Sequence, residues 1–261
     1  MKQFCIKILA SILLLSTLFI VTVSAEGGEG WFIIKHGNST PDFPNSCRYL
    51  DINDCYYIDK EAICKGDKTV YLTFDVGYEN GNVTKTVDIL NENDVKGAFF
   101  VLDNVVKKNP ELMRKLIDDG HTICNHTKNH KNLTKLTDEE IELNLKMLED
   151  LVLEKYGYTM PKYFRYPEGY YNEHTVKLLS SLGYKTFFWS LAYADWDNCN
   201  QPSEEYALNK LLQNMHPGAV ILLHPTSQTN VKILDKFIKE LKSQGYHFEE
   251  LRNLVPGKKE S

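Results

Sequence analysis

The sequence lacks the features that mark nucleic-acid-binding, fibrous or disulfide-rich proteins. Its 261 residues contain only six cysteines and nine prolines, with no internal repeat and no run of lysine and arginine. An apolar fraction of 43% and a charged fraction of 25% are ordinary for a globular protein, which excludes a disordered or fibrous chain. Nucleic-acid binding depends on neutralising phosphates, so an acidic chain without a basic stretch is a poor candidate for it.

The cysteines form no disulfide framework that spacing alone identifies. Cys5 lies in an N-terminal apolar segment, and the other five are odd in number and contain no CxxC pair. One local bridge, such as Cys55–Cys64, and independent free thiols are both compatible with this pattern.

Residues 1–25 have the composition of an export signal. Lys2 and Lys7 precede the uncharged apolar run Ile8–Val23, and Val23–Ala25 offers small residues for cleavage. The run is shorter than a comfortable membrane span and has no basic flank behind it. We therefore expect an exported, extracytoplasmic protein; the alternative is an uncleaved membrane anchor. Cleavage removes two of the 30 basic residues and none of the 35 acidic ones, which leaves a net charge near −7.

The rest of the chain divides into two parts. Residues 26–66 are rich in Gly, Asn, Pro and Asp, so we interpret them as an extension outside the core that wraps the following domain. From residue 67 to about 256, short apolar strands alternate with helices, which is typical of βα units and a parallel sheet. Strands are predicted at 69–75, 97–102, 121–124, 163–166, 186–191, 219–223 and 246–248. Helices are predicted at 83–93, 110–119, 137–156, 173–182, 203–215 and 231–244.

This alternation predicts an α/β fold, a distorted and partly open parallel (β/α) barrel of about seven strands. In parallel barrels the reactive groups sit at the carboxyl ends of the strands. The residues of this chain that could carry chemistry do lie at predicted strand ends.

Two of these positions could hold a base and a metal ion. Asp75 closes the apolar stretch TVYLTFD, where a carboxylate is costly unless it is paired or functional, although it could simply cap the next turn. His126 and His130 are four residues apart, a spacing that brings both rings to one side of a helical turn and suits a shared metal ion. Two solvent-facing histidines would give the same pattern.

Three further positions follow later strands. Arg165, in FRYPEG, could hold a carboxylate in its ionised form or make an ordinary surface ion pair. Trp196, after Asp195, could wall a small apolar pocket or simply pack in the core. His224, in LLHP, is suited to general acid catalysis, with a satisfied core histidine as the alternative.

Taken in order, TFDxG, HTxxH, RYPEG, DW and LLH resemble the NodB-homology polysaccharide deacetylases, carbohydrate esterase family 4, over residues 68–254. TFDVGYENG, RYPEGYYNEHT, FFWSLAYADW and HPGAVILLHPTSQTN are similar to one branch, the delta-lactam-biosynthetic de-N-acetylases of spore-forming bacteria. The resemblance implies removal of acetyl groups from N-acetylmuramic acid in cortex peptidoglycan. The freed amine would then close as muramic δ-lactam.

The resemblance also implies a role for each matching residue. Asp75 would be the general base, and Arg165 would keep it ionised. His126 and His130 would bind a divalent metal, zinc or another transition metal, that activates water. His224 would protonate the leaving amine. On the substrate side, the resemblance implies a backbone oxyanion contact at Tyr166, next to Pro167, and a pocket for the acetyl methyl formed by Trp196 and Leu222.

Two departures from the family pattern bear on these roles. Val76 stands where the family commonly has a second Asp that completes the metal site, so weaker metal binding is expected here. Ala192 stands where many members carry the Asp that orients the catalytic histidine. Asp195 remains nearby, and the sequence leaves open whether it reaches His224.

The resemblance suggests peptidoglycan glycan strands as partner, in the cell wall or spore cortex. It also suggests functional coupling to an N-acetylmuramoyl-L-alanine amidase that removes the stem peptides. Two alternatives remain open. One is an N-acetylglucosamine deacetylase of peptidoglycan or chitin-like glycan. The other is a degenerate glycan-binding protein that lost its metal together with the missing Asp.

Overall fold

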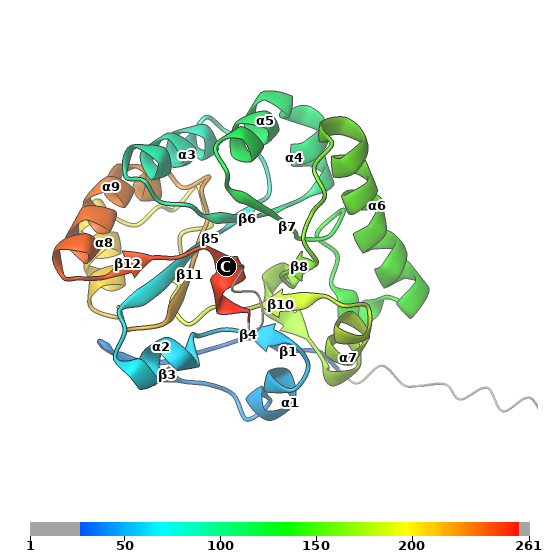
Figure 1. Ribbon diagram of the computed structural model, residues 1–261, viewed down its shortest axis with the longest axis horizontal. Helices are drawn as coiled ribbons and strands as arrows, with labels where there is room; N and C mark the ends of the chain where they lie inside the picture. Colours follow the sequence, from blue (N-terminus) through cyan, green and yellow to red (C-terminus); the bar gives the residue numbers. More distant parts are fainter. Residues whose placement is uncertain (1–26, 256–261) are drawn as a thin grey trace, which may run out of the picture.

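The computed structural model describes residues 27–255, which fold around one curled parallel sheet (Figure 1). Its strands follow the order β11-β5-β6-β7-β8-β10-β4, with β12 beside β5. The strands of this sheet are β4 (Cys55–Tyr56), β5 (Thr69–Val76), β6 (Ala98–Val101), β7 (Thr122–Asn125), β8 (Tyr163–Phe164), β10 (Lys185–Phe187), β11 (Ala219–Leu223) and β12 (His247–Phe248).

The sheet is partly closed near the carboxyl ends of its strands. The segment after β10 reaches β11, where Leu191 forms a parallel bridge with Ile221 and Leu222 N–H donates to the Leu191 carbonyl at 2.9 Å. All strand pairs of this sheet are parallel. The predicted fold class, a distorted and partly open (β/α) barrel, is confirmed.

Helices surround the sheet on its outer side (Figure 1). They are α3 (Asn82–Glu92), α4 (Asp103–Lys108), α5 (Pro110–Asp118), α6 (Asp138–Tyr156), α7 (Glu173–Ser181), α8 (Glu204–Leu212) and α9 (Gln228–Ser243). Their apolar faces pack on alternate residues of the strands, such as Leu72 and Phe74 of β5, because successive strand residues point to opposite faces. The other face of the strands lines the interior of the half-barrel.

The clearest helix signal in the sequence is confirmed in detail. The Thr137 hydroxyl accepts from Glu140 N–H, and the Glu140 carboxylate accepts from Thr137 N–H, which closes a capping box at the start of α6. The helix ends at Gly157, whose φ of 66° is favourable for glycine. The short helix α4 was not predicted.

The interpretation of residues 26–66 as lying outside the core is wrong for the part that the structure describes. Trp31, Leu50 and Tyr57 are buried in a hydrophobic cluster that also contains Phe188, and the Trp31 and Phe188 rings stack at 4.6 Å. Strand β4 adds an edge to the main sheet beside β10. The sequence pattern did not reveal that this segment contributes to the core, because its buried residues are single large side chains without a regular spacing.

The remaining elements are short. β1 (Glu29–Gly30) pairs with β9 (Tyr170–Tyr171), and β2 (Ile34–His36) pairs with β3 (Ser39–Asp42), both antiparallel. The short helices and 3-10 turns are α1 (Cys47–Asp51), α2 (Lys60–Lys65), η1 (Leu133–Lys135), η2 (Pro167–Gly169) and η3 (Leu251–Leu254). The five cysteines between residues 27 and 255 are free thiols, so the Cys55–Cys64 bridge does not form.

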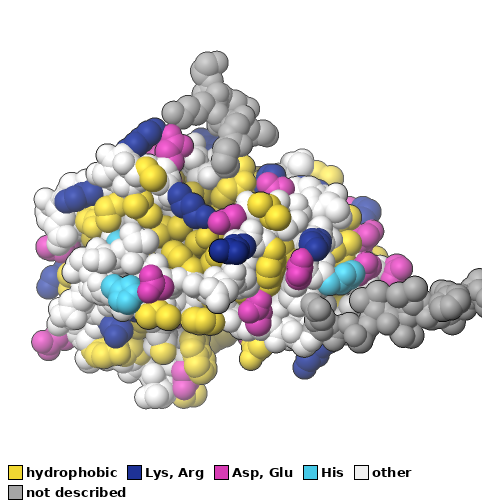
Figure 2. Space-filling model, turned by 90° about the horizontal axis from the view of Figure 1, so that it is seen from below, with side chains coloured by type: hydrophobic (Ala, Val, Ile, Leu, Met, Phe, Trp, Pro, Cys, Tyr) yellow, Lys and Arg dark blue, Asp and Glu magenta, His cyan; other side chains and the backbone are white. Residues whose placement is uncertain are grey.

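The surface carries charges of both signs. In Figure 2, acidic and basic side chains are interspersed among apolar ones, without a patch of a single sign on the face shown. Within residues 27–255 no helix has the length and apolar character needed to cross a bilayer. The predicted export signal lies outside the described residues.

Candidate active site

The carboxyl end of β5 presents an acidic side chain to the interior of the half-barrel. Phe74 and Val76 point to the helices and are buried in the core, so Asp75 between them points inward. Its carboxylate is 11% exposed. The predicted strand-end position of Asp75 is therefore confirmed, and a turn cap is not its role, because its partners come from other strands.

Arg165 is fully buried directly after β8 and bonds to the Asp75 carboxylate. Its Nη1 donates to Asp75 Oδ1 at 2.9 Å, and its Nη2 donates to Thr73 Oγ1 at 2.8 Å. Its Nε donates to the Phe187 carbonyl at 2.9 Å, and its guanidinium lies 4.2 Å from the Phe100 ring centre. The surface ion pair considered for Arg165 is excluded, because this cation has partners on β5 and β10 and no solvent contact.

Opposing effects act on the Asp75 carboxyl. Burial alone would raise its pKa. The nearby charge of Arg165 lowers it, His126 and His224 act in the same direction, and together they outweigh burial, so the net pKa lies below its usual value. Asp75 is therefore ionised at neutral pH and can accept a proton. This is the protonation state that a general base requires.

The two histidines predicted to bind a metal lie together, but in a loop and not on a helical turn. His126 follows β7 directly, and Thr127 and His130 have positive φ values of 73° and 58°. Asn125 Oδ1 accepts from Thr127 N–H at 2.9 Å, which fixes this loop. The His126 and His130 rings lie edge to face with centroids 5.1 Å apart, so the predicted convergence is present.

The donor atoms of this pair are compatible with a metal ion. His126 Nδ1 donates to the Arg165 carbonyl at 3.0 Å, which leaves the lone pair on Nε2. Burial lowers the pKa of His126 to about 4, so the ring is neutral. Its Nε2 lies 3.7 Å from Asp75 Oδ2, which is too far for a hydrogen bond, so the Nε2 lone pair is not bonded to this carboxylate.

The donor set is small. Val76 is fully buried in the core, and no group of three or more His, Cys, Asp and Glu side chains within residues 27–255 has the geometry to hold a metal. A cation bound by His126 and His130 would complete its shell with solvent or substrate oxygens, as in catalytic sites that keep open positions.

His224 stands at the end of the strand next to that of Asp75, because Leu223 of β11 pairs with Phe74 of β5, and it is oriented by Asp195. It follows β11, its side chain is 26% exposed, and its Nδ1 donates to Asp195 Oδ1 at 2.7 Å. The contact that the sequence left open is therefore present. Burial lowers the pKa of His224, but the Asp195 hydrogen bond and charge, with Asp75, raise it, and the net pKa is above its ordinary value. The raised pKa favours the protonated imidazole, which is the form that a general acid requires.

The residues predicted to contact the substrate differ in their exposure to solvent. Tyr166 is buried, with its ring stacked on Phe188, and Pro167 begins η2 beside it. Leu222 is 5% exposed within β11. Trp196 is 65% exposed, which excludes core packing. Its place beside a substrate, like the Tyr166 oxyanion contact, stays a prediction.

Sequence reasoning missed the residues that support this site. Asn230 lies 2% exposed in the first turn of α9 and donates to Asp195. Helix α9 was predicted to begin at residue 231, but it begins at Gln228, with Ser227 as its N-cap. Ser227 is a residue type that commonly begins a helix, and this signal could have placed Asn230 inside α9.

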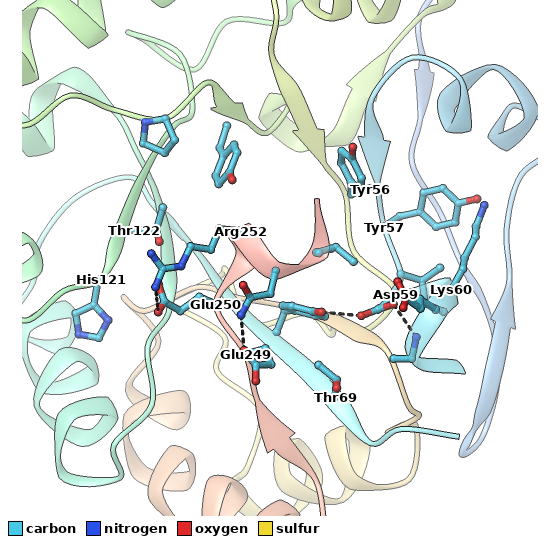
Figure 3. A pocket seen from close by; sticks show the side chains of 18 of the residues that line it. Tyr56, Tyr57, Asp59, Lys60, Thr69, His121, Thr122, Glu249, Glu250 and Arg252 are labelled. Carbon is cyan, nitrogen blue, oxygen red and sulfur yellow. Dashed lines mark hydrogen bonds and ion pairs between the residues drawn. The ribbon is translucent and has the colours of Figure 1, made fainter. Parts of the chain in front are cut away.

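The large cavity of about 1480 Å³ lies at the other end of the sheet (Figure 3). It is lined by the amino ends of the strands, including Thr69 and Thr122, and contains none of the predicted site residues. Several of its polar groups are paired: Asp59 accepts from the Tyr71 hydroxyl at 2.6 Å, and His247 Nε2 bonds to Thr69 Oγ1 at 2.7 Å. The residues predicted to carry chemistry therefore lie away from this cavity, at the carboxyl ends of the strands.

An ionised carboxylate and, at the end of the adjacent strand, a histidine whose protonated form is favoured define a hydrolytic site with a base and an acid. Comparison with known proteins identifies the family to which the chain belongs. The sequence pattern of the polysaccharide deacetylases matches residues 62–187. The chain is 41% identical over 189 residues to the peptidoglycan-N-acetylmuramic acid deacetylase PdaA of Bacillus subtilis, a match that covers 72% of each chain.

Two further similarities, one in sequence and one in structure, indicate the same family. A peptidoglycan-N-acetylglucosamine deacetylase of Bacillus cereus is 33% identical over 243 residues, covering 84% of this chain and 87% of its own length. The structure of Bacillus subtilis PdaA, a family 4 carbohydrate esterase, matches with a TM-score of 0.83 and 36% identity, over 89% of this chain and 98% of that one. The chain belongs to the polysaccharide deacetylases and is a hydrolase of amide bonds.

Proposed function

We propose that this protein removes the acetyl group from N-acetylmuramic acid residues of peptidoglycan by hydrolysis. The observation that carries the proposal is the pair of groups at the ends of adjacent strands, Asp75 held ionised by Arg165 and His224 with its protonated form favoured by Asp195. The similarity to the muramic acid deacetylase of Bacillus subtilis supports the choice of sugar.

In this mechanism Asp75 takes a proton from the water that attacks the acetyl carbonyl carbon. The Tyr166 N–H, next to Pro167, stabilises the oxyanion that forms. The carbon–nitrogen bond then breaks, and His224 gives its proton to the departing nitrogen, because an amine anion is a poor leaving group. Acetate and a free amino sugar are the products. Arg165 keeps Asp75 charged before the attack, and Asp195 keeps Nε2 of His224 directed outward as the donor.

We further propose that His126 and His130 hold a divalent transition metal, zinc or a similar ion. When bound, it would supply Lewis acidity for water activation and carbonyl polarisation. The neutral His126 ring with its free Nε2 lone pair supports this assignment. Because Val76 contributes no ligand, binding is expected to be weaker than at a site with three protein ligands.

The biological setting follows from the same assignment. We propose an exported protein that acts on glycan strands in the cell wall or spore cortex after an N-acetylmuramoyl-L-alanine amidase has removed the stem peptides. The free amine then attacks the lactyl carboxyl group of the same sugar, with loss of water, to give muramic δ-lactam. The export signal predicted in residues 1–25 supports this setting.

The test is incubation of the purified protein with amidase-treated, peptide-free peptidoglycan and a divalent metal. Mass spectrometry of a muramidase digest measures loss of acetyl and formation of lactam, and a chelator control tests the metal. Asp75→Asn should abolish turnover, whereas Asp150→Asn, in an exposed ion pair with Lys146 on α6, should not change it. Full activity of Asp75→Asn would refute the base assignment.

A second candidate is an N-acetylglucosamine deacetylase, which the similarity to the Bacillus cereus enzyme favours. The same digest separates the two, because deacetylated glucosamine without lactam would identify it. No product with any metal would instead support a glycan-binding protein without activity.

A further inference from the structure

The Asp195–His224 pair is itself held by a neighbouring amide. The Asp195 side chain is buried and accepts three hydrogen bonds. Two come from His224, from its backbone N–H at 2.8 Å and from Nδ1 at 2.7 Å. The third comes from Asn230 Nδ2 at 2.6 Å.

Asn230 contacts both members of the pair. Besides Asp195, its Nδ2 donates to the His224 carbonyl at 3.0 Å. Its own N–H donates to Ser227 Oγ at 3.1 Å, which fixes the first turn of α9. A single amide therefore connects the carboxylate, the backbone of the histidine and a helix of the scaffold.

The orientation of this amide is determined by its partners. Nδ2 faces two acceptors, the Asp195 carboxylate and the His224 carbonyl, while Oδ1 accepts from the Tyr193 hydroxyl. A rotated amide would place Oδ1 against both acceptors, which is repulsive. Tyr193 satisfies the remaining oxygen, so that no group of this buried amide is without a partner.

The loop that carries Asp195 is fastened to the start of α9 by a second contact. Gln201 Nε2 donates to the Asp195 carbonyl at 3.0 Å, and Gln201 Oε1 accepts from Ser227 Oγ. Asn230, in the first turn of α9, and Gln201, which bonds to the α9 N-cap Ser227, thus hold the loops of Asp195 and His224 together.

We propose that Asn230 is a positioning residue for the Asp195–His224 pair, with Tyr193 fixing the orientation of its amide. The proposal rests on the proposed role of His224 as proton donor. The Asn230 amide keeps the imidazole in the orientation that turns Nε2 to the departing nitrogen. It also shares the Asp195 charge, which would otherwise act on the imidazole alone.

The charged groups that act on His224 give the direction of the expected change. They are Asp195 and Asp75, which favour the protonated ring, and Arg165, which disfavours it. Without the Asn230 donor, the Asp195 charge acts more strongly on His224, so the pKa of His224 rises. The alkaline limb of the pH–rate profile, where the acid loses its proton, then moves to higher pH.

The experiment compares Asn230→Ala, Tyr193→Phe and a matched control, Asn93→Ala. Asn93 is also a buried asparagine whose Nδ2 donates to a carboxylate (Asp235) and a backbone carbonyl (Ile89), but it lies at the end of α3. The readouts are kcat, KM and the pH–rate profile on peptide-free glycan. NMR titration of the histidine rings without substrate, with His224 identified by its absence in His224→Gln, is the readout independent of turnover.

Asn230→Ala is expected to lower kcat about tenfold, the scale of one charge-assisted hydrogen bond, with KM within about twofold. The His224 titration and the alkaline limb move up together. Tyr193→Phe shifts both less in the same direction, and Asn93→Ala shifts neither. An unchanged His224 titration in Asn230→Ala, or an equal loss of kcat in Asn93→Ala, overturns the proposal. A shifted titration in a protein that deacetylates no glycan supports the positioning and refutes the proposed function.

Discussion

Replacing Arg165 by methionine should strongly destabilise the protein, because it leaves a buried carboxylate without its counter-charge. Arg165 donates to Asp75, to Thr73 Oγ1 and to the Phe187 carbonyl, and none of these acceptors has a substitute donor in methionine. Removing one member of a buried ion pair typically costs about 3–5 kcal/mol of unfolding free energy. We expect a loss of this size at pH 7, measured by urea unfolding.

A double-mutant cycle with Asp75→Asn isolates the contribution of the pair. The Asp75→Asn substitution removes the carboxylate charge that Arg165→Met leaves unpaired. The double variant should therefore lose about 1–3 kcal/mol less unfolding free energy than the sum of the two single losses. Arg165→Lys retains a charge without the planar fork and should lose less, which provides a folded variant if methionine prevents folding.

The free energy of unfolding should depend on pH in a direction that the Asp75 pKa determines. In the wild type the folded pKa of Asp75 is depressed, so its stabilisation is present above the unfolded value and is lost as the pH falls through the folded pKa. In Arg165→Met burial raises the folded pKa, so the deficit should shrink as the pH falls from 7 to about 5. Additive losses within about 0.5 kcal/mol, or a deficit independent of pH, would refute this account of the site.

Three further results are expected. His224→Gln should lower kcat by about 10²–10⁴-fold, while calorimetry shows glycan affinity within about twofold, because the acid acts only in the reaction; a large loss of affinity would contradict that role. His126→Ala or His130→Ala should weaken zinc binding at least about tenfold in a competition titration, and equal affinity in all three proteins would exclude the pair as ligands. Burial lowers the folded pKa of His121 to about 4, so stability should fall by about 3 kcal/mol between pH 6.5 and 4. In urea unfolding His121→Gln should lose less over this range, and an identical slope would contradict the assignment.

The sequence predicted the barrel well because its strands are apolar and separated by strong breaks. The seven strands expected between residues 67 and 256 are all present, and the five motif positions meet at the carboxyl ends of the strands. Asp75 was placed correctly because alternation along TVYLTFD separates it from the apolar face. The export signal, the domain limits and the roles of the substrate-side residues remain predictions.

What could not be predicted depends on contacts between distant residues. The spacing of His126 and His130 suggested a helical turn, but Asn125 and Asn144 hold this segment in a loop, and Asn144 comes from the middle of α6. The contact between Asp195 and His224 depends on how two loops meet, which no local pattern records. Residues before 67 gave no period, because their contribution to the core is a few isolated side chains, such as Trp31, Leu50 and Tyr57.

The position of β4 has a consequence for how the chain folds. This edge strand is among the first elements made, yet its register is set by β10, where Thr186 pairs with Cys55. Strand β5 likewise cannot complete its pairing until β11 has formed, because Val70 of β5 pairs with Ala219 of β11. Contacts between residues so far apart in sequence must overcome a large loss of chain entropy before they stabilise anything, so folding should be slow. A chain shortened before β11 would leave β5 with an unpaired side, a strand edge that invites association with other copies.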